Sequence, residues 1–177
     1  MSIMTLPLPL PETYWVIPGC FLAGEYPTIP YFQEISRRRL DAFLAAGIEI
    51  FINLTREGEL DDYAPLLKER ARNFEISAET WRFEIDDYGV PSRNLMLNIL
   101  DRIDSSLSAG KKIYVHCHGG VGRTGTVVGC YLVRSGNDSQ AALAQLAEWW
   151  QKVPKSSVHP RSPEAPSQEA FVRSWLE

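Results

Sequence analysis

Cysteine is scarce in this sequence, with three in 177 residues, and the three are not spaced as pairs. That scarcity argues against a disulfide framework and against a zinc site built from cysteines. We therefore expect free thiols and a reducing, cytoplasmic compartment. Internal repeats and linker-like segments are also lacking, so we expect one domain in a chain long enough to bury a full core.

A strong excess of charge is lacking as well. There are 18 Lys and Arg against 22 Asp and Glu, a formal net charge of −4, so neither nucleic acid nor an acidic membrane surface is an expected partner. Residues 1–11 are apolar but contain three prolines and no basic residue, which predicts neither a signal peptide nor a spanning helix. We expect an extended arm over residues 1–13 and a single domain over residues 14–177.

Apolar runs and turn residues alternate along the chain as they do in α/β proteins. Strands are expected at 14–17 and 20–24 (an opening hairpin), 48–54, 80–85 and 112–116. Helices are expected at 31–46, 61–73, 92–107, 123–135, 139–152 and 166–177, with Ser92 as an N-cap. This order predicts a mostly parallel central sheet flanked by helices. Ligands bind such sheets at the carboxyl ends of the strands.

The segment 116–125, which reads HCHGGVGRTG, carries the strongest chemical signal. It lies between an expected strand and an expected helix. A tight glycine-rich loop in that place points backbone N–H groups inward, beside the positive end of the helix dipole, and so forms an anion site. Arg123 adds a bidentate fork for phosphate oxygens, and the same positive field stabilises a thiolate at Cys117. A nucleophile aimed at a bound phosphate is a phosphatase arrangement.

This loop resembles the phosphate-binding loop of the cysteine-based protein tyrosine and dual-specificity phosphatases, in which His-Cys is followed by five residues, Arg and then Ser or Thr. The resemblance covers residues 14–177 and implies the fold of that family and a phosphocysteine intermediate. It implies Cys117 as nucleophile and Thr124 as a hydroxyl donor to the sulfur. It implies that His116 supports the loop through hydrogen bonds and tunes the thiol. It also implies that five residues bind phosphate beside Cys117 and Arg123: His118, Gly119, Gly120, Val121 and Gly122.

A second loop offers a general acid. Residues 86–91 read DDYGVP and follow the expected strand at 80–85. Phosphotyrosine releases a phenolate, which an acid should protonate. The segment resembles the acid loop of the family, where Asp stands four residues before Pro, and that register selects Asp87 over Asp86. Outside this context both would be ordinary turn residues.

A third segment, 163–172, is similar to the family segment in which a Gln follows a Pro-containing turn and begins the last helix. The resemblance implies that Gln168 positions the water that hydrolyses the phosphocysteine. Ala165 stands where the family frequently has Thr, so the match is partial. The other interpretation of Gln168 is a solvated residue in the first turn of a helix.

Together these segments predict a phosphomonoesterase that acts on phosphotyrosine proteins, with or without phosphoserine and phosphothreonine, and uses neither cofactor nor metal. The sequence does not determine the oligomeric state, for which we favour a monomer. Three alternatives stay open. The substrate could instead be a phosphoinositide, an inositol phosphate or an RNA 5′-phosphate, although the loop lacks the lysines frequent in relatives with polyanionic substrates. The chain could be a non-catalytic phosphopeptide-binding module, although such modules lose Cys, Arg or Asp. A rhodanese-like sulfurtransferase would require neither Asp87 nor Gln168.

Overall fold

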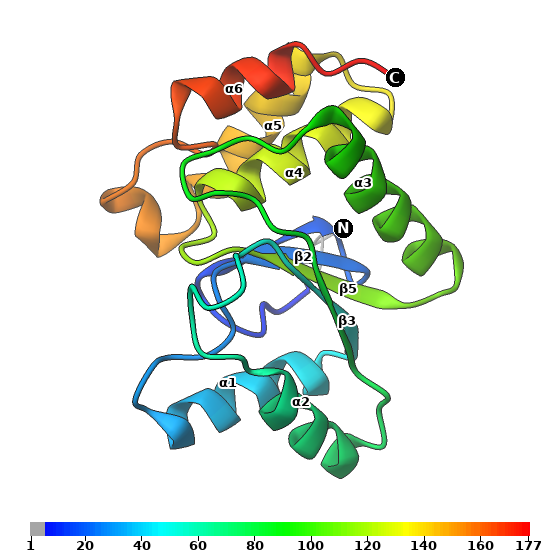
Figure 1. Cartoon of the computed structure of the whole chain (residues 1–177), viewed down its shortest axis with the longest axis vertical. Coiled ribbons are helices and arrows are strands. Elements are labelled where there is room, and N and C mark those ends of the chain that lie inside the picture. The colour runs from blue at the N-terminus through cyan, green and yellow to red at the C-terminus, as the bar shows by residue number, and fades with distance from the viewer. Residues whose placement is uncertain (1–5) are drawn as a thin grey trace, which may run out of the picture.

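A five-stranded sheet runs through the centre of the computed structural model, which describes residues 6–177 (Figure 1). The strand order is β1-β2-β5-β3-β4. β2, β5, β3 and β4 pair in parallel, and β1 pairs with β2 antiparallel, which confirms the predicted mostly parallel sheet. The strands are β1 (Thr13–Ile17), β2 (Phe21–Gly24), β3 (Ile48–Asn53), β4 (Glu79–Arg82) and β5 (Lys112–His116).

Helices cover both faces of this sheet (Figure 1). α1 (Gln33–Ala45) and α2 (Ala64–Ala71) lie on one face, and the other helices lie on the opposite face. These are α3 (Arg93–Ser108), α4 (Gly122–Arg134), α5 (Ser139–Trp150) and α6 (Pro166–Arg173). Short 3-10 helices follow α2 at Arg72–Phe74 and α5 at Pro154–Ser157. Within residues 6–177, no helix combines the length and the apolar character that crossing a membrane requires.

Successive side chains of the central strand β5 point to opposite faces of the sheet, and a separate hydrophobic core lies on each face. Ile113 and Val115 of β5 pack in the core under α3, α4 and α5, whereas Tyr114 between them packs in the core under α1 and α2. All three side chains are fully buried. Covered on both faces and paired on both edges, β5 is a rigid base for the loop that follows it.

Several element ends differ from the predictions. The strand expected at 80–85 ends at Arg82, because β4 pairs only with β3, which itself ends at Asn53. Beyond the end of β4 the backbone makes isolated hydrogen bonds to the end of β3 and the segment after it. One example is the bond that Ile85 N donates to Leu54 O at 3.1 Å. The last helix ends at Arg173 rather than 177, and Glu177 instead turns back to pair with Arg134 on α4, with Oε1 and Nε 2.7 Å apart.

The start of the chain was expected to be an extended arm over residues 1–13. Residues 1–5 of that segment lie outside the described residues, and residues 6–12 contain neither helix nor strand. β1 begins one residue early, because Thr13 already pairs with Gly24. The predicted N-cap of the third helix is confirmed, since the Ser92 hydroxyl accepts a hydrogen bond from Leu95 N at 3.1 Å.

Candidate active site

The candidate nucleophile Cys117 follows directly after β5 and begins the loop that leads into α4. Its side chain is buried, with 3% of its surface exposed. The Gly120 N–H points at Sγ across 3.3 Å. The sulfur therefore lies inside the curve of the loop, near the N-terminus of a 13-residue helix whose dipole favours negative charge there.

The carbonyl groups of the loop are held from outside. His118 O accepts from Tyr26 N at 2.9 Å, Gly119 O from Lys155 Nζ at 3.1 Å, and Val121 O from the Ser162 hydroxyl at 2.7 Å. In a planar trans peptide the N–H of the next residue points the opposite way from the carbonyl. Each of these bonds therefore turns one amide toward the inside of the loop, as the Gly120 amide shows.

Arg123 lies in the first turn of α4, with 1% of its surface exposed. Its Nη1 and Nη2 donate to the two carboxylate oxygens of Glu59 at 2.8 and 2.7 Å, and Nη1 also donates to Ile85 O at 3.1 Å. The hydrogen bond from Arg123 holds the pKa of Glu59 below its usual value. Among the described residues Nε has no hydrogen-bond partner, so one donor of this fixed guanidinium is left for another group.

The two neighbouring aspartates of the acid loop face different arginines. Asp87 Oδ1 lies 3.1 Å from Arg123 Nη2, whereas Asp86 Oδ1 lies 3.0 Å from Arg56 Nη1. The Asp87 side chain is 60% exposed. A turn closed by a 2.8 Å hydrogen bond from Gly89 N to Asp86 O carries the aspartates apart. Asp87 therefore reaches the candidate phosphate site, and Asp86 does not.

His116 lies on the other side of the nucleophile, fully buried among aromatic rings. Its Nε2 is 2.7 Å from the Tyr63 hydroxyl, and its Nδ1 is 3.2 Å from Cys117 O. Burial lowers the pKa of His116 from 6.5 to about 3, so the ring is neutral at physiological pH. The imidazole therefore fixes the backbone of Cys117 and has no charge to offer the sulfur.

Thr124 and Gln168 occupy buried positions beside the loop. The Thr124 hydroxyl donates to Gly24 O at 3.4 Å. Gln168 accepts from Ala165 N at 3.0 Å through Oε1 and donates to Gly89 O at 3.1 Å through Nε2. Gln168 is thus no solvated residue of the last helix, because it links α6 to the acid loop.

A pocket of about 440 Å³ opens over the loop and collects side chains from several segments. Asp87 and Tyr88 line it together with the exposed His118, and Lys155 lines it from the short 3-10 helix. Lys155 also pairs with Glu25, at the end of β2. No local sequence pattern identifies Lys155 or Glu59 as a partner of the loop, since each contacts it only through the tertiary fold.

Fold and site together define the class of the protein. A candidate nucleophile loop between a central parallel strand and a buried helix, with a fixed arginine and a candidate acid loop beside it, is the arrangement expected of the cysteine-based tyrosine and dual-specificity phosphatases. The family described as "Polymorphic toxin system, DSP-PTPase phosphatase" matches residues 31–137, which include Asp87, Cys117 and Arg123. The chain belongs to this family of DSP-PTPase phosphatases.

Individual relatives agree with this assignment. The mouse protein tyrosine phosphatase domain-containing protein 1 is 35% identical over 103 residues, 54% of this chain but only 14% of the mouse protein. A putative tyrosine phosphatase of invertebrate iridescent virus 3 is 28% identical over 161 residues, 86% of this chain and 60% of the viral protein. The crystal structure of Tk-PTP in its active form has the same fold, with a TM-score of 0.72 and 24% identity, over 94% of this chain and 99% of that one.

Proposed function

We propose that this protein hydrolyses phosphotyrosine through a phosphocysteine intermediate. The observation that carries the proposal is that three candidate groups from two loops converge: the thiol of Cys117, at which the Gly120 amide points across 3.3 Å, the guanidinium of Arg123 at the end of the same loop, and the carboxyl of Asp87 from the acid loop, 3.1 Å from that guanidinium. Residues 14–177 form the catalytic domain, which acts as a monomer in a reducing cytoplasmic compartment where the thiol stays free.

In the first step, the loop amides and Arg123 bind the phosphate oxygens. The Cys117 thiolate attacks phosphorus in line with the ester bond. As the S–P bond forms, the P–O bond to the tyrosine ring breaks, and the protonated Asp87 gives its proton to the leaving oxygen. The buried and pre-oriented donors of the loop stabilise the charge on the equatorial oxygens in the transition state.

In the second step, water attacks the phosphocysteine. The Asp87 carboxylate takes a proton from that water, the S–P bond breaks, and phosphate and the thiolate are released. Gln168 positions this water from its buried place beside the acid loop. An amide side chain has two donor hydrogens and two acceptor lone pairs, and the bonds to Gly89 and Ala165 use one of each. Thr124 donates its hydroxyl to the departing sulfur after releasing the Gly24 carbonyl.

The charges around the pocket favour a phosphoprotein over a polyanionic lipid or inositol phosphate. Lys155 is paired with Glu25, and Asp87 and Glu164 add further negative charge to the lining. A substrate with several phosphates would meet these carboxylates, whereas a single phosphate is neutralised by the loop itself. Serine and threonine phosphates could also reach the nucleophile, and relative rates on matched phosphopeptides measure this.

The test is hydrolysis of p-nitrophenyl phosphate and of a phosphotyrosine peptide with reductant and EDTA. We expect turnover that vanadate inhibits and peroxide abolishes, because both act at the anion site and its thiolate. Cys117→Ser should lose turnover and still bind vanadate or phosphate. A Cys117→Ser protein that keeps a substantial part of the wild-type kcat, or an enzyme that EDTA silences, would show that the mechanism is wrong.

A further inference from the structure

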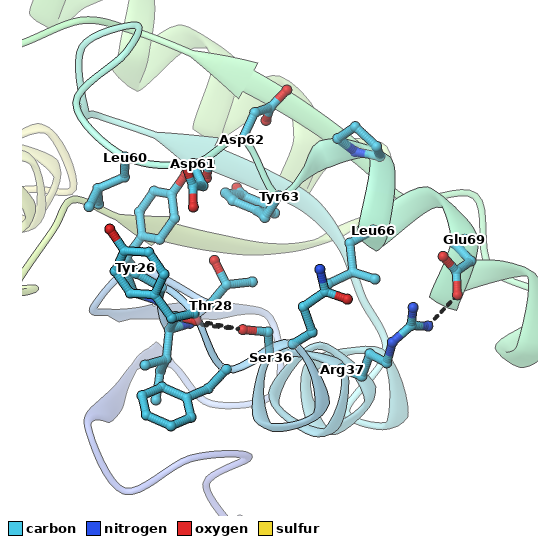
Figure 2. A pocket seen from close by; sticks show the side chains of 16 residues that line it. Tyr26, Thr28, Ser36, Arg37, Leu60, Asp61, Asp62, Tyr63, Leu66 and Glu69 are labelled. Atoms are coloured by element: carbon cyan, nitrogen blue, oxygen red, sulfur yellow. Dashed lines mark hydrogen bonds and ion pairs between the residues drawn. The ribbon is translucent and has the colours of Figure 1, made fainter.

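A second hollow, with a volume of about 540 Å³, adjoins the pocket over the nucleophile loop. It lies between the segment that leads into α1 and the segment that leads into α2 (Figure 2). The two hollows share part of their lining: Tyr26, Thr28, Ile29, Pro30 and Leu60. A chain whose phosphorylated residue enters the first pocket can therefore lay neighbouring residues in the second.

Exposed apolar side chains surround the second hollow. Tyr31 is 97% exposed, Phe32 57% and Ile29 36%, and all three line it. The loop that carries them is fixed, because the buried Ser36 hydroxyl accepts from Ile29 N at 3.0 Å and donates to Ile29 O at 3.1 Å (Figure 2). A fixed loop that presents large apolar side chains to water is typical of a binding surface.

The charge of the lining is negative. Three carboxylates, those of Asp61, Asp62 and Glu69, stand against one guanidinium, that of Arg37. Glu69 pairs with Arg37, and Asp62 caps the start of α2 by accepting from Ala64 N at 3.0 Å. Within residues 6–177 the Asp61 carboxylate has no hydrogen-bond or ion-pair partner. Asp61 lines the hollow together with Tyr26 and Tyr63, and Figure 2 shows the three residues in the same part of it.

We propose that this second hollow binds a segment of the phosphoprotein substrate that carries an apolar side chain and a lysine or arginine. The inference rests on the proposed function, since the phosphotyrosine of the same chain occupies the first pocket. The apolar side chain packs on the Ile29 and Phe32 walls, and the cation pairs with Asp61. The negative lining disfavours an acidic peptide or an anionic lipid at this position.

The experiment uses alanine-based phosphotyrosine peptides that contain one leucine and one arginine, the arginine being moved along the peptide. We expect one position of the arginine to raise kcat/KM about two- to fivefold over alanine, the range for an exposed ion pair, and the gain to shrink at high salt. Asp61→Asn should remove this gain, and Phe32→Ala should remove the preference for leucine. Neither variant should change hydrolysis of p-nitrophenyl phosphate, which is too small to reach the second hollow.

Glu34→Gln is the matched control. It removes the same charge from α1, and Glu34 does not line the hollow. The inference is wrong if every peptide is hydrolysed equally well, if acidic peptides are preferred, or if Asp61→Asn and Glu34→Gln reduce the arginine preference equally. In each of those cases, turnover of p-nitrophenyl phosphate would leave the proposed function standing. A protein that hydrolyses none of these phosphate esters would refute the proposed function and this inference with it.

Discussion

At the scale of single residues, the adjacent aspartates Asp86 and Asp87 show how a turn separates two identical side chains. Both lie in the same exposed loop, yet only Asp87 reaches the buried guanidinium of Arg123. Asp86 forms an exposed pair with Arg56, and such surface pairs contribute little. The register of the loop therefore gives two chemically equal groups different partners.

We expect Asp87→Asn to lower kcat on a phosphotyrosine peptide by about 10²–10⁴, the usual effect of removing a general acid. The fall of kcat with rising pH, which is expected when a general acid must be protonated, should also disappear. The loss should be smaller for a highly activated aryl phosphate, whose leaving group needs little protonation. Steady-state kinetics over a range of pH values measures all three effects.

Asp86→Asn is the control for this prediction, because it makes the same chemical change one residue away. It should cost far less and keep the pH profile. If the two variants exchanged these phenotypes, Asp86 would be the acid. If neither mattered, the acid would have to be sought elsewhere.

At the scale of elements, the nucleophile loop depends on how closely it approaches the end of β2. Gly120 has φ of +75°, and a Cβ there would lie 2.5 Å from the carbonyl carbon of Gly24. The loop can curve around the Cys117 sulfur only because no side chain separates these two segments. Position 120 thus needs glycine both for its left-handed backbone and for the space.

We expect Gly120→Ala to destabilise the fold and to lower kcat/KM strongly, because the loop must move away from β2. Gly110→Ala is a matched control. Gly110 has nearly the same φ, +74°, but a Cβ there would meet no atom within 4 Å. The control should cost about 1–3 kcal/mol of backbone strain and leave kcat unchanged. Denaturant unfolding and steady-state kinetics compare the two, and equal losses of stability and activity would show that the close approach is unimportant.

The sequence predicted elements well where a local pattern set them. The strand at 112–116 has the predicted bounds, because its apolar run is enclosed by a glycine and by the loop. The helix that Ser92 caps is set by its cap and its apolar period. The end of β4 was not predictable, because it depends on where the neighbouring strand β3 stops. An edge strand extends only as far as its partner allows.

At the scale of the whole molecule, partners far apart in the chain complete the site. Tyr63 meets His116 across 53 positions and Glu59 meets Arg123 across 64. The loop motif revealed the cysteine and the arginine, since both belong to one local pattern. No local pattern indicates a tyrosine or a glutamate that pairs only after the sheet has formed. These supporting residues therefore could not be predicted from the sequence.

The buried His116 should couple the stability of the whole fold to pH. Its pKa is about 3 in the folded protein, against an ordinary value of 6.5, because burial disfavours the charged ring. Between these values the unfolded chain binds a proton that the folded chain does not. The free energy of unfolding should therefore fall by about 1.4 kcal/mol for each pH unit as the pH drops below 6.5.

Urea unfolding at several pH values measures this slope. Carboxylates also titrate in the acid range, so the informative quantity is the difference between wild type and His116→Asn. The variant should be less stable at neutral pH, where it loses packing and the bond to Tyr63, and its stability should fall less steeply toward acid. Parallel curves for the two proteins would contradict the assignment of a buried neutral ring.

The two hydrogen bonds between Glu59 and Arg123 lower the entropy cost that binding a phosphate at this arginine would carry. A free arginine side chain carries about 2 kcal/mol of rotamer entropy, which a flexible site loses each time it closes on its ligand. Here folding has already removed that freedom, because both terminal nitrogens are held and the side chain is buried. Under the proposed function, the arriving phosphate would meet a donor that has no conformations left to lose, so its binding energy would be available for the reaction.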